Sequence, residues 1–116
     1  MGSPFVDRRD GELTASDIGS FLRGGYNSAV QYTLTQAFST TLPIGTEIAV
    51  FRYSTGTATA KIIASGVRWA VPGQTEFLSG KTLSVAATLG TVILKKLYNN
   101  ASQGDLWTVM GNVEVL

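Results

Sequence analysis

The chain has 116 residues and a net charge of +1, with 44% hydrophobic and only 15% charged residues, which suits one folded domain and argues against intrinsic disorder. It contains no cysteine and no histidine, which excludes a disulfide scaffold, a thiolate or imidazole metal site and the usual nucleophile–histidine pairs of hydrolases. Its nine basic residues are scattered, and no apolar run approaches the roughly 20 residues that span a bilayer, so we expect neither nucleic-acid binding nor membrane insertion.

Residues 1–28 are predicted to form a polar lead-in and then a helix of about two turns, which is too short to be stable unless it docks on the rest of the chain. Thr14 and Asp17 have the spacing of a helix cap, and Leu13 and Ile18 have that of a hydrophobic staple. We interpret the segment as a docking or oligomerisation element. An apolar stripe and a glycine pair complete the helix pattern: Ile18, Phe21 and Leu22, then Gly24 and Gly25.

From residue 29 to the end, short alternating apolar runs replace the helical period, and glycine- or proline-containing turns separate them. The spacing of about ten residues is typical of a β-sandwich or barrel. We therefore predict an all-β fold, an antiparallel β-sandwich or jelly-roll-like barrel of seven or eight short strands with one short N-terminal helix. The predicted strands are 30–34, 47–53, 57–64, 67–71, 82–87, 91–97, 106–110 and 113–116.

Two predicted strands, 47–53 and 91–97, are apolar on both faces, whereas a half-exposed antiparallel strand should alternate. Their second face must be covered, and in so small a domain a sister subunit is the favoured cover. The alternative is that the lead-in and the helix cover that face within one chain. The residues expected at an interface between sister copies are Phe21, Leu22, Phe51, Tyr53, Ile93 and Leu97.

Catalytic groups are scarce. Glu47 and Glu76 are the only pair of carboxylates that the body of the chain offers to a glycosidase, and both look like solvated charges at strand ends. The acidic residues Asp7, Asp10 and Glu12 lack the alternate spacing of a calcium loop. No phosphate-binding glycine loop is present. We expect a protein without catalytic activity, cofactor or metal.

Aromatic residues are the remaining binding candidates, because a ring offers a stacking face and, in tyrosine, a polar tip. Trp69 and Trp107 share strand faces with valines, which favours the core over a ligand platform. Arg52 and Arg68 are expected to be solvated, with contact to a partner as the alternative. The candidate ligand or receptor site combines two tyrosines at strand ends with the neighbouring polar loop: Tyr53, Tyr98, Asn99 and Asn100.

Residues 41–112 resemble a β-sandwich module of tail-fibre and related virion proteins of tailed bacteriophages. The stretch that carries the resemblance begins with Leu-Pro-Ile-Gly-Thr-Glu-Ile at 42–48, continues through Gly-Thr-Val-Ile-Leu at 90–94, and ends with Leu-Trp-Thr-Val-Met-Gly-Asn at 106–112. These motifs are structural, and none supplies a catalytic residue.

The resemblance implies a virion component that is made in the host cytoplasm, forms a homo-oligomer, often a trimer, and contacts other virion proteins or a host surface glycan. The predicted function is that of a non-enzymatic structural or attachment module. A small capsid decoration or head-fibre protein and a stand-alone carbohydrate-binding domain are the alternatives.

Overall fold

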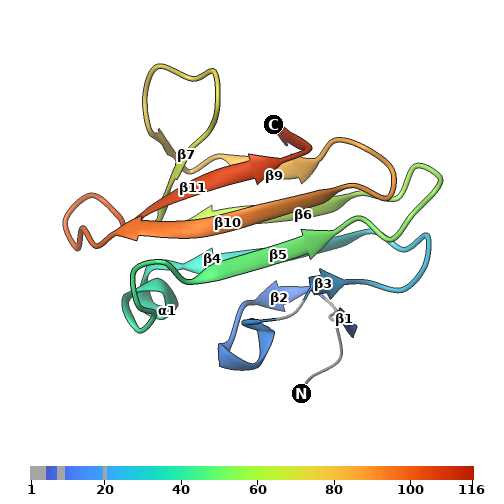
Figure 1. Ribbon diagram of the computed structural model, residues 1–116, viewed down its shortest axis with the longest axis horizontal. Coiled ribbons are helices and arrows are strands. Elements are labelled where there is room, and N and C mark those ends of the chain that lie inside the picture. The colour runs from blue at the N-terminus through green and yellow to red at the C-terminus, as the bar shows by residue number, and fades with distance from the viewer. Residues whose placement is uncertain (1–4, 8–9, 20) are drawn as a thin grey trace.

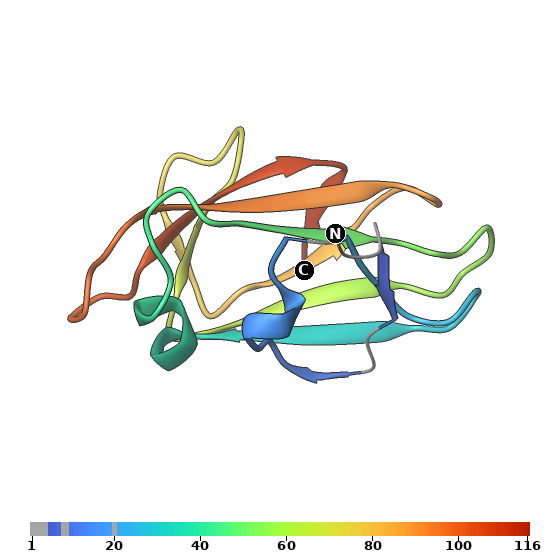
Figure 2. The same ribbon diagram turned by 60° about the horizontal axis from the view of Figure 1, so that its bottom comes forward.

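The computed structural model describes residues 5–7, 10–19 and 21–116, and in these residues the chain is mostly β. The strands form two sheets that lie one over the other (Figure 1 and Figure 2). The seven-stranded sheet has the order β1-β3-β5-β10-β11-β7-β8, and the five-stranded sheet has the order β12-β9-β6-β4-β2. The strands are β1 Phe5–Asp7, β2 Gly11–Glu12, β3 Phe21–Arg23, β4 Val30–Thr35, β5 Glu47–Phe51, β6 Ala60–Ser65, β7 Arg68–Ala70, β8 Leu78–Ser79, β9 Thr82–Val85, β10 Thr91–Tyr98, β11 Leu106–Gly111 and β12 Val113–Val115.

Each of the eight predicted segments contains a strand, so the prediction of a β fold from alternation is confirmed. The prediction that the sheets are antiparallel is wrong, because five strand pairs are parallel: β1 with β3, β3 with β5, β7 with β11, β2 with β4, and β4 with β6. Both sheets are therefore mixed. They are also two open sheets and do not close into a barrel.

The parallel pairs follow from the path of the chain between the layers. β4 lies in the five-stranded sheet, β5 returns in the seven-stranded sheet, and β6 comes back to lie beside β4. Two reversals leave β6 running in the same direction as β4, with partners from Val30↔Ala60 to Thr35↔Ser65. Hairpin-like alternation in the sequence does not reveal that consecutive strands belong to different sheets.

The predicted N-terminal helix is wrong beyond its first turn. Only a 3-10 turn, η1, forms at Ala15–Asp17, and there the Asp17 carboxylate accepts a hydrogen bond from the Thr14 backbone nitrogen at 2.7 Å. Phe21–Arg23 is instead strand β3, which pairs with β1 and β5. Phe21 and Leu22 are adjacent, which is compatible with the apolar spacing of a helix or of a strand. Their pairing with β5 stabilises the strand, in which Leu22 points into the core. Residues 1–4 and 8–9 of the predicted lead-in are outside the described residues.

The core lies between the two sheets. It includes Trp69 and Trp107, both fully buried, as the sequence predicts. The indole nitrogen of Trp69 donates to the Lys81 carbonyl at 2.8 Å. One helix was not predicted, α1 at Gln36–Thr40, whose five residues are too few to show a period; Thr35 caps it by accepting from the Phe38 nitrogen at 3.1 Å.

Candidate functional site

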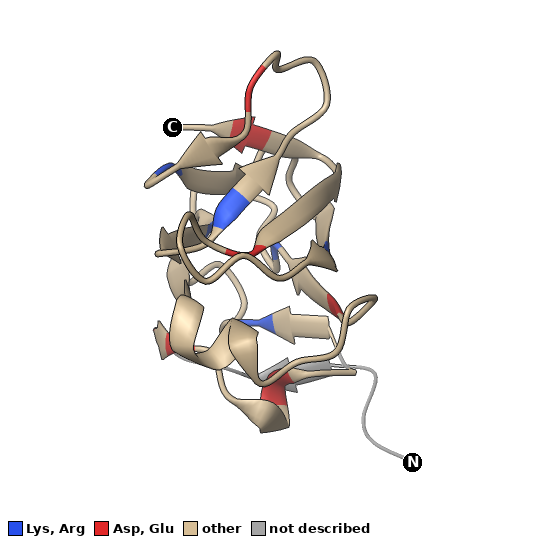
Figure 3. Ribbon diagram, turned by 90° about the vertical axis from the view of Figure 1, so that its left-hand side faces the viewer, with Lys and Arg blue, Asp and Glu red and all other residues tan. Residues whose placement is uncertain are grey.

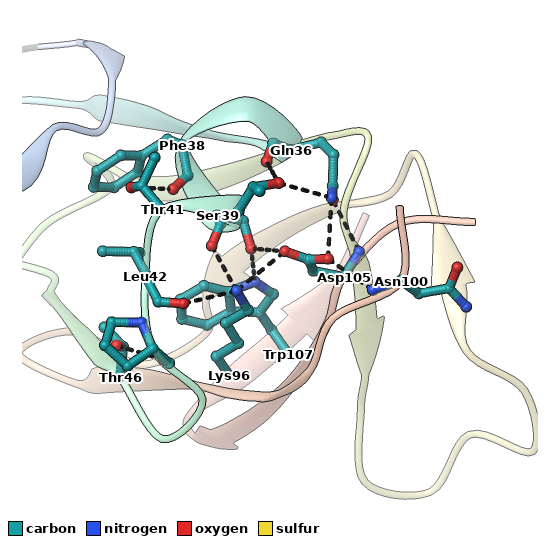
Figure 4. A network of polar contacts seen from close by, with 12 residues as sticks. Gln36, Phe38, Ser39, Thr41, Leu42, Thr46, Lys96, Asn100, Asp105 and Trp107 are labelled. Carbon is teal, nitrogen blue, oxygen red and sulfur yellow. Dashed lines mark hydrogen bonds and ion pairs between the residues drawn. The ribbon is translucent and has the colours of Figure 1, made fainter. Parts of the chain in front are cut away.

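A buried ion pair lies at the end of the molecule where β10 ends, β11 begins and α1 packs (Figure 4). Lys96 Nζ is 3.2 Å from Asp105 Oδ2, and the two side chains are 0% and 2% exposed. Lys96 Nζ also donates to the carbonyl oxygens of Ser39 and Leu42 at 2.6 and 2.8 Å. Figure 3 shows the molecule from this end, with Lys and Arg in blue and Asp and Glu in red. The pair therefore fastens α1 and the turn after it to β10 and β11.

Asp105 is surrounded by donors. Its carboxylate accepts from Ser39 Oγ at 2.6 Å, Gln36 Nε2 at 3.0 Å and the Asn100 nitrogen at 2.8 Å. Burial alone would raise the pKa of Asp105, but these hydrogen bonds and the one from Lys96 outweigh it and hold the pKa at about 2. The carboxylate is thus a charged acceptor with its partners in place, and the site is structural in character.

Sequence reasoning missed this network, although one signal was present. Lys95 and Lys96 are adjacent on a strand, so only one of them can face solvent. Lys96 shares its side of β10 with Val92 and Leu94, both fully buried. Nothing local in the sequence points to its partner Asp105, which comes from the loop before β11.

The predicted ligand residues do not form one site. Phe51 pairs with Thr91 at the start of β10, whereas Tyr98 is the last residue of that strand, so Tyr53 and Tyr98 lie near opposite ends of the sheet (Figure 1). Asn100 organises its own loop: its Oδ1 accepts from the nitrogens of Ser102 and Gln103 at 3.2 and 3.0 Å. Asn99 is exposed beside it.

The prediction that Arg68 is solvated is wrong, and Arg52 is half-buried rather than fully solvated. The Arg52 guanidinium donates to backbone carbonyls of two loops, including Ala58 at 2.9 Å and Val85 at 3.2 Å. Arg68 is buried, donates from Nε to the Gly104 carbonyl at 3.0 Å, and lies over the ring of Phe77. Both guanidinium groups hold loops, because loop carbonyls that leave the ladder still require donors.

The outward side of the seven-stranded sheet carries a row of apolar side chains, and no described segment lies over it (Figure 1). The row crosses four strands in register, because Phe21 pairs with Ala49, Ala49 with Ile93, and Ile93 with Met110. Alternation along the strands adds two apolar residues on the same side, and with them the charged residues Arg23, Glu47 and Lys95 at its borders. We call the set the apolar face: Phe21, Ala49, Phe51, Ile93, Leu97 and Met110.

The predicted interface residues divide between this face and other places. Phe21, Phe51, Ile93 and Leu97 belong to the apolar face, as the two-faced strands suggest. Leu22 does not, since it is fully buried in the core. Tyr53 lies beyond the end of β5 against Arg23, whose guanidinium is 4.5 Å from its ring centroid. The described part of the lead-in extends the sheet through β1 and does not cover the apolar face.

The outward side of the five-stranded sheet has a different composition. Its corresponding row is polar, since Gln31 pairs with Lys61, Lys61 with Ser84, and Ser84 with Glu114. The neighbouring row contains Ile63 as its one large aliphatic residue, between Thr33 and Thr82. The central row of one outer sheet surface is thus apolar, and that of the other is polar.

The two glutamates considered for catalysis are not brought together. Glu47 Oε2 lies 3.5 Å from Lys95 Nζ on the outer side of β5 and β10. Glu76 lines a shallow hollow of about 100 Å³ that contains no second carboxylate: Ala70, Val71, Gln74, Thr75, Glu76 and Phe77. Across the described residues, no three acidic side chains gather where a metal ion would fit. None of the helices in those ranges has the length and apolar character to span a bilayer.

Comparison with protein-family models, curated proteins and solved structures finds no match to this chain.

Proposed function

We propose that the two facing sheets form a β-sandwich module of a virion surface protein, similar to the tail-fibre proteins of tailed bacteriophages. The module has no catalytic activity of its own. It assembles with sister copies and presents its loops to a host-surface receptor or to a neighbouring virion protein. A tail fibre and a small capsid decoration or head-fibre protein both fit this proposal, because each exposes such a module at the particle surface.

The observation that carries the proposal is the apolar face. The row Phe21, Ala49, Ile93 and Met110 crosses β3, β5, β10 and β11 without a charge, whereas the corresponding row on the opposite outer surface is Gln31, Lys61, Ser84 and Glu114. An uncharged row with large aliphatic and aromatic side chains at the centre of a sheet face favours burial against another protein surface.

A second copy of the chain is the occupant that the charges favour. Glu47 and Lys95 lie side by side at the border of the apolar face, each about half exposed. A sister copy related by a rotation axis can therefore set its Lys95 against Glu47 while the uncharged centres meet. Sheets also pack face to face in this way inside domains, at about 10 Å separation. Such a contact between identical faces joins two copies; in the trimer that the resemblance implies, each apolar face packs against a different part of a sister copy.

The test is the mass in solution, measured by sedimentation from micromolar to near-millimolar protein, for the natural chain and two variants. Ile93→Glu places a carboxylate in the middle of the apolar face, and an unpaired charge buried there should cost roughly 2–5 kcal/mol per interface. We expect the natural chain to sediment as a homo-oligomer and Ile93→Glu as a folded monomer.

Ile63→Glu is the matched control, because Ile63 is also a half-buried strand isoleucine but lies on the polar outer surface. It should leave the mass unchanged. A natural chain that stays monomeric at the highest concentration contradicts the proposal, as does equal loss of assembly in both variants.

A further inference from the structure

Three loops meet at the end of the molecule opposite the buried ion pair, at the right in Figure 1. We call the loops 24–29, 52–59 and 86–90 together the loop tip. Hydrogen bonds join them: the Asn27 nitrogen donates to the Tyr53 carbonyl at 2.8 Å, and the Leu89 nitrogen donates to the Ser54 carbonyl at 3.2 Å. Loops that are joined by backbone hydrogen bonds in this way hold one conformation.

The Arg52 side chain adds further hydrogen bonds between the loops of the loop tip. Besides the bonds to Ala58 and Val85, its guanidinium donates to Gly56 at 3.1 Å and to Ala86 at 3.4 Å, so one side chain holds two of the three loops. The third loop is tied by the Asn27 side chain, whose Oδ1 accepts from the Thr55 nitrogen at 3.0 Å. The tip is therefore organised before any ligand arrives, which reduces the entropy lost on binding.

Backbone strain is also concentrated here. Among the described residues, Asn27 and Leu89 are the two non-glycine residues with positive φ, each at 55°. Leucine is poorly suited to this conformation, and glycine would adopt it without strain. The Leu89 side chain is also 50% exposed, so packing in the core does not explain why a leucine is there. Strain of this kind occurs at binding sites, where the surrounding structure enforces it.

The surface that these loops present is aromatic and rich in hydroxyl groups. Tyr26 is 53% exposed, and its hydroxyl lies 2.9 Å from Thr55 Oγ1. The ring of Tyr53 supports Tyr26 in an edge-to-face contact with the centroids 5.0 Å apart. Tyr53 itself is half-buried between Tyr26 and Arg23, so Tyr26 offers the more exposed ring of the two.

Apart from Arg52, the three loops contain no charged residue; they consist of glycine, alanine, serine, threonine, asparagine, tyrosine and leucine. Tyrosine, serine, glycine and asparagine are the residues that antibody loops use for adaptable, uncharged recognition. Through Ala29 and Thr59, two of the three loops border a hollow of about 140 Å³ that Asp10 and Lys61 also line. Side chains of opposite charge and hydroxyl groups together suit ligands that both donate and accept hydrogen bonds.

We infer that the loop tip is a binding site for an uncharged saccharide, with Tyr26 stacking on a sugar ring and Leu89 contacting it from the neighbouring loop. The inference rests on the proposed function, of which it names the receptor class and the end of the module that binds it. A sugar ring offers an apolar C–H face and a rim of hydroxyl groups, which match an exposed tyrosine framed by threonine and asparagine.

The test uses an array of neutral oligosaccharides of glucose, galactose and mannose, with sialylated and uronic-acid oligosaccharides as the charged set. We expect the natural chain to bind members of the neutral set, and Tyr26→Ala to weaken that binding roughly tenfold or more. Tyr98→Ala is the matched control, because Tyr98 is an exposed tyrosine at the opposite end of the sheet and should leave binding unchanged.

Leu89→Gly separates a binding role from a structural one. Glycine relieves the strain at this position, so the melting temperature should stay equal or rise while saccharide binding falls several-fold. A lower melting temperature with unchanged binding would overturn the inference. So would binding of the charged set alone, equal effects of Tyr26→Ala and Tyr98→Ala, or failure of the natural chain to bind any neutral member.

Failure of the proposed function shows in a different measurement. If the natural chain is monomeric yet binds neutral saccharides through Tyr26, the loop-tip site stands and the assembly proposal falls. If the chain assembles through Ile93 but binds no neutral saccharide even with the avidity of the oligomer, the saccharide inference falls alone.

Discussion

Lys95 and Lys96 are neighbours on β10, and they lie in opposite environments. Lys95 faces outward, where its ion pair with Glu47 is half exposed at 3.5 Å. Lys96 faces inward, where its ion pair with Asp105 is almost fully buried at 3.2 Å. Two identical side chains one residue apart thus serve different purposes. The inner pair holds the fold together, and the outer pair borders the surface that we propose for assembly.

Breaking the inner pair should have the largest effect on stability. Asp105→Asn removes the carboxylate but keeps its size, and leaves the buried Lys96 ammonium without a countercharge. We expect the free energy of unfolding to fall by about 3–5 kcal/mol, because a buried charge that loses its partner is not rehydrated. Urea unfolding of both proteins at one concentration measures it. A decrease in the free energy of unfolding of less than about 1 kcal/mol would show that the ion pair does not hold α1 to β10 and β11 as we describe.

Acid should weaken the same pair without mutation. The pKa of Asp105 in the folded chain is about 2, below its ordinary 3.8, so its contribution to stability is present above pH 4 and is lost as the pH falls from about 4 to 2. The natural chain should therefore lose about 2 kcal/mol more than Asp105→Asn over that interval. Urea unfolding at pH 5 and near pH 2 measures the difference. Parallel losses in the two proteins would contradict it.

Breaking the outer pair should have the smallest effect. Glu47→Gln removes one partner of a pair that water already solvates, and such pairs contribute roughly 0–1 kcal/mol. Urea unfolding of the dilute protein should change by about 0.5 kcal/mol or less, and the change should shrink further in high salt. A loss as large as that of Asp105→Asn would mean that the two sides of β10 do not differ as we describe.

The sequence predicts the strands well because side-chain alternation is local information. All eight alternating runs became strands, whereas η1 stopped after one turn because Phe21 and Leu22 pair with β5. The parallel pairing of β4 with β6 depends on which sheet the intervening strand joins, which neighbouring residues do not encode.

The candidate sites were likewise predicted only where neighbouring residues in the sequence carry the pattern. The apolar face follows from alternation on two strands, so Phe51 and Ile93 were found, but Leu22 was misplaced with the helix that did not form. For the loop tip, the sequence predicts Tyr53 as a ligand residue but does not predict Tyr26. Tyr26 lies 27 residues before Tyr53 in the chain, and only the fold brings the centroid of its ring to 5.0 Å from that of Tyr53.

The measurement that tests the central claim most directly is cysteine labelling, because the chain contains no cysteine of its own. Ile93→Cys and Ile63→Cys each place one thiol at a half-buried strand position, one on the apolar face and one on the polar outer surface. At near-millimolar protein, we predict slow maleimide labelling of Ile93→Cys that becomes fast on dilution, and concentration-independent labelling of Ile63→Cys. Equal rates for both variants at every concentration would contradict the claim that sister copies cover the apolar face.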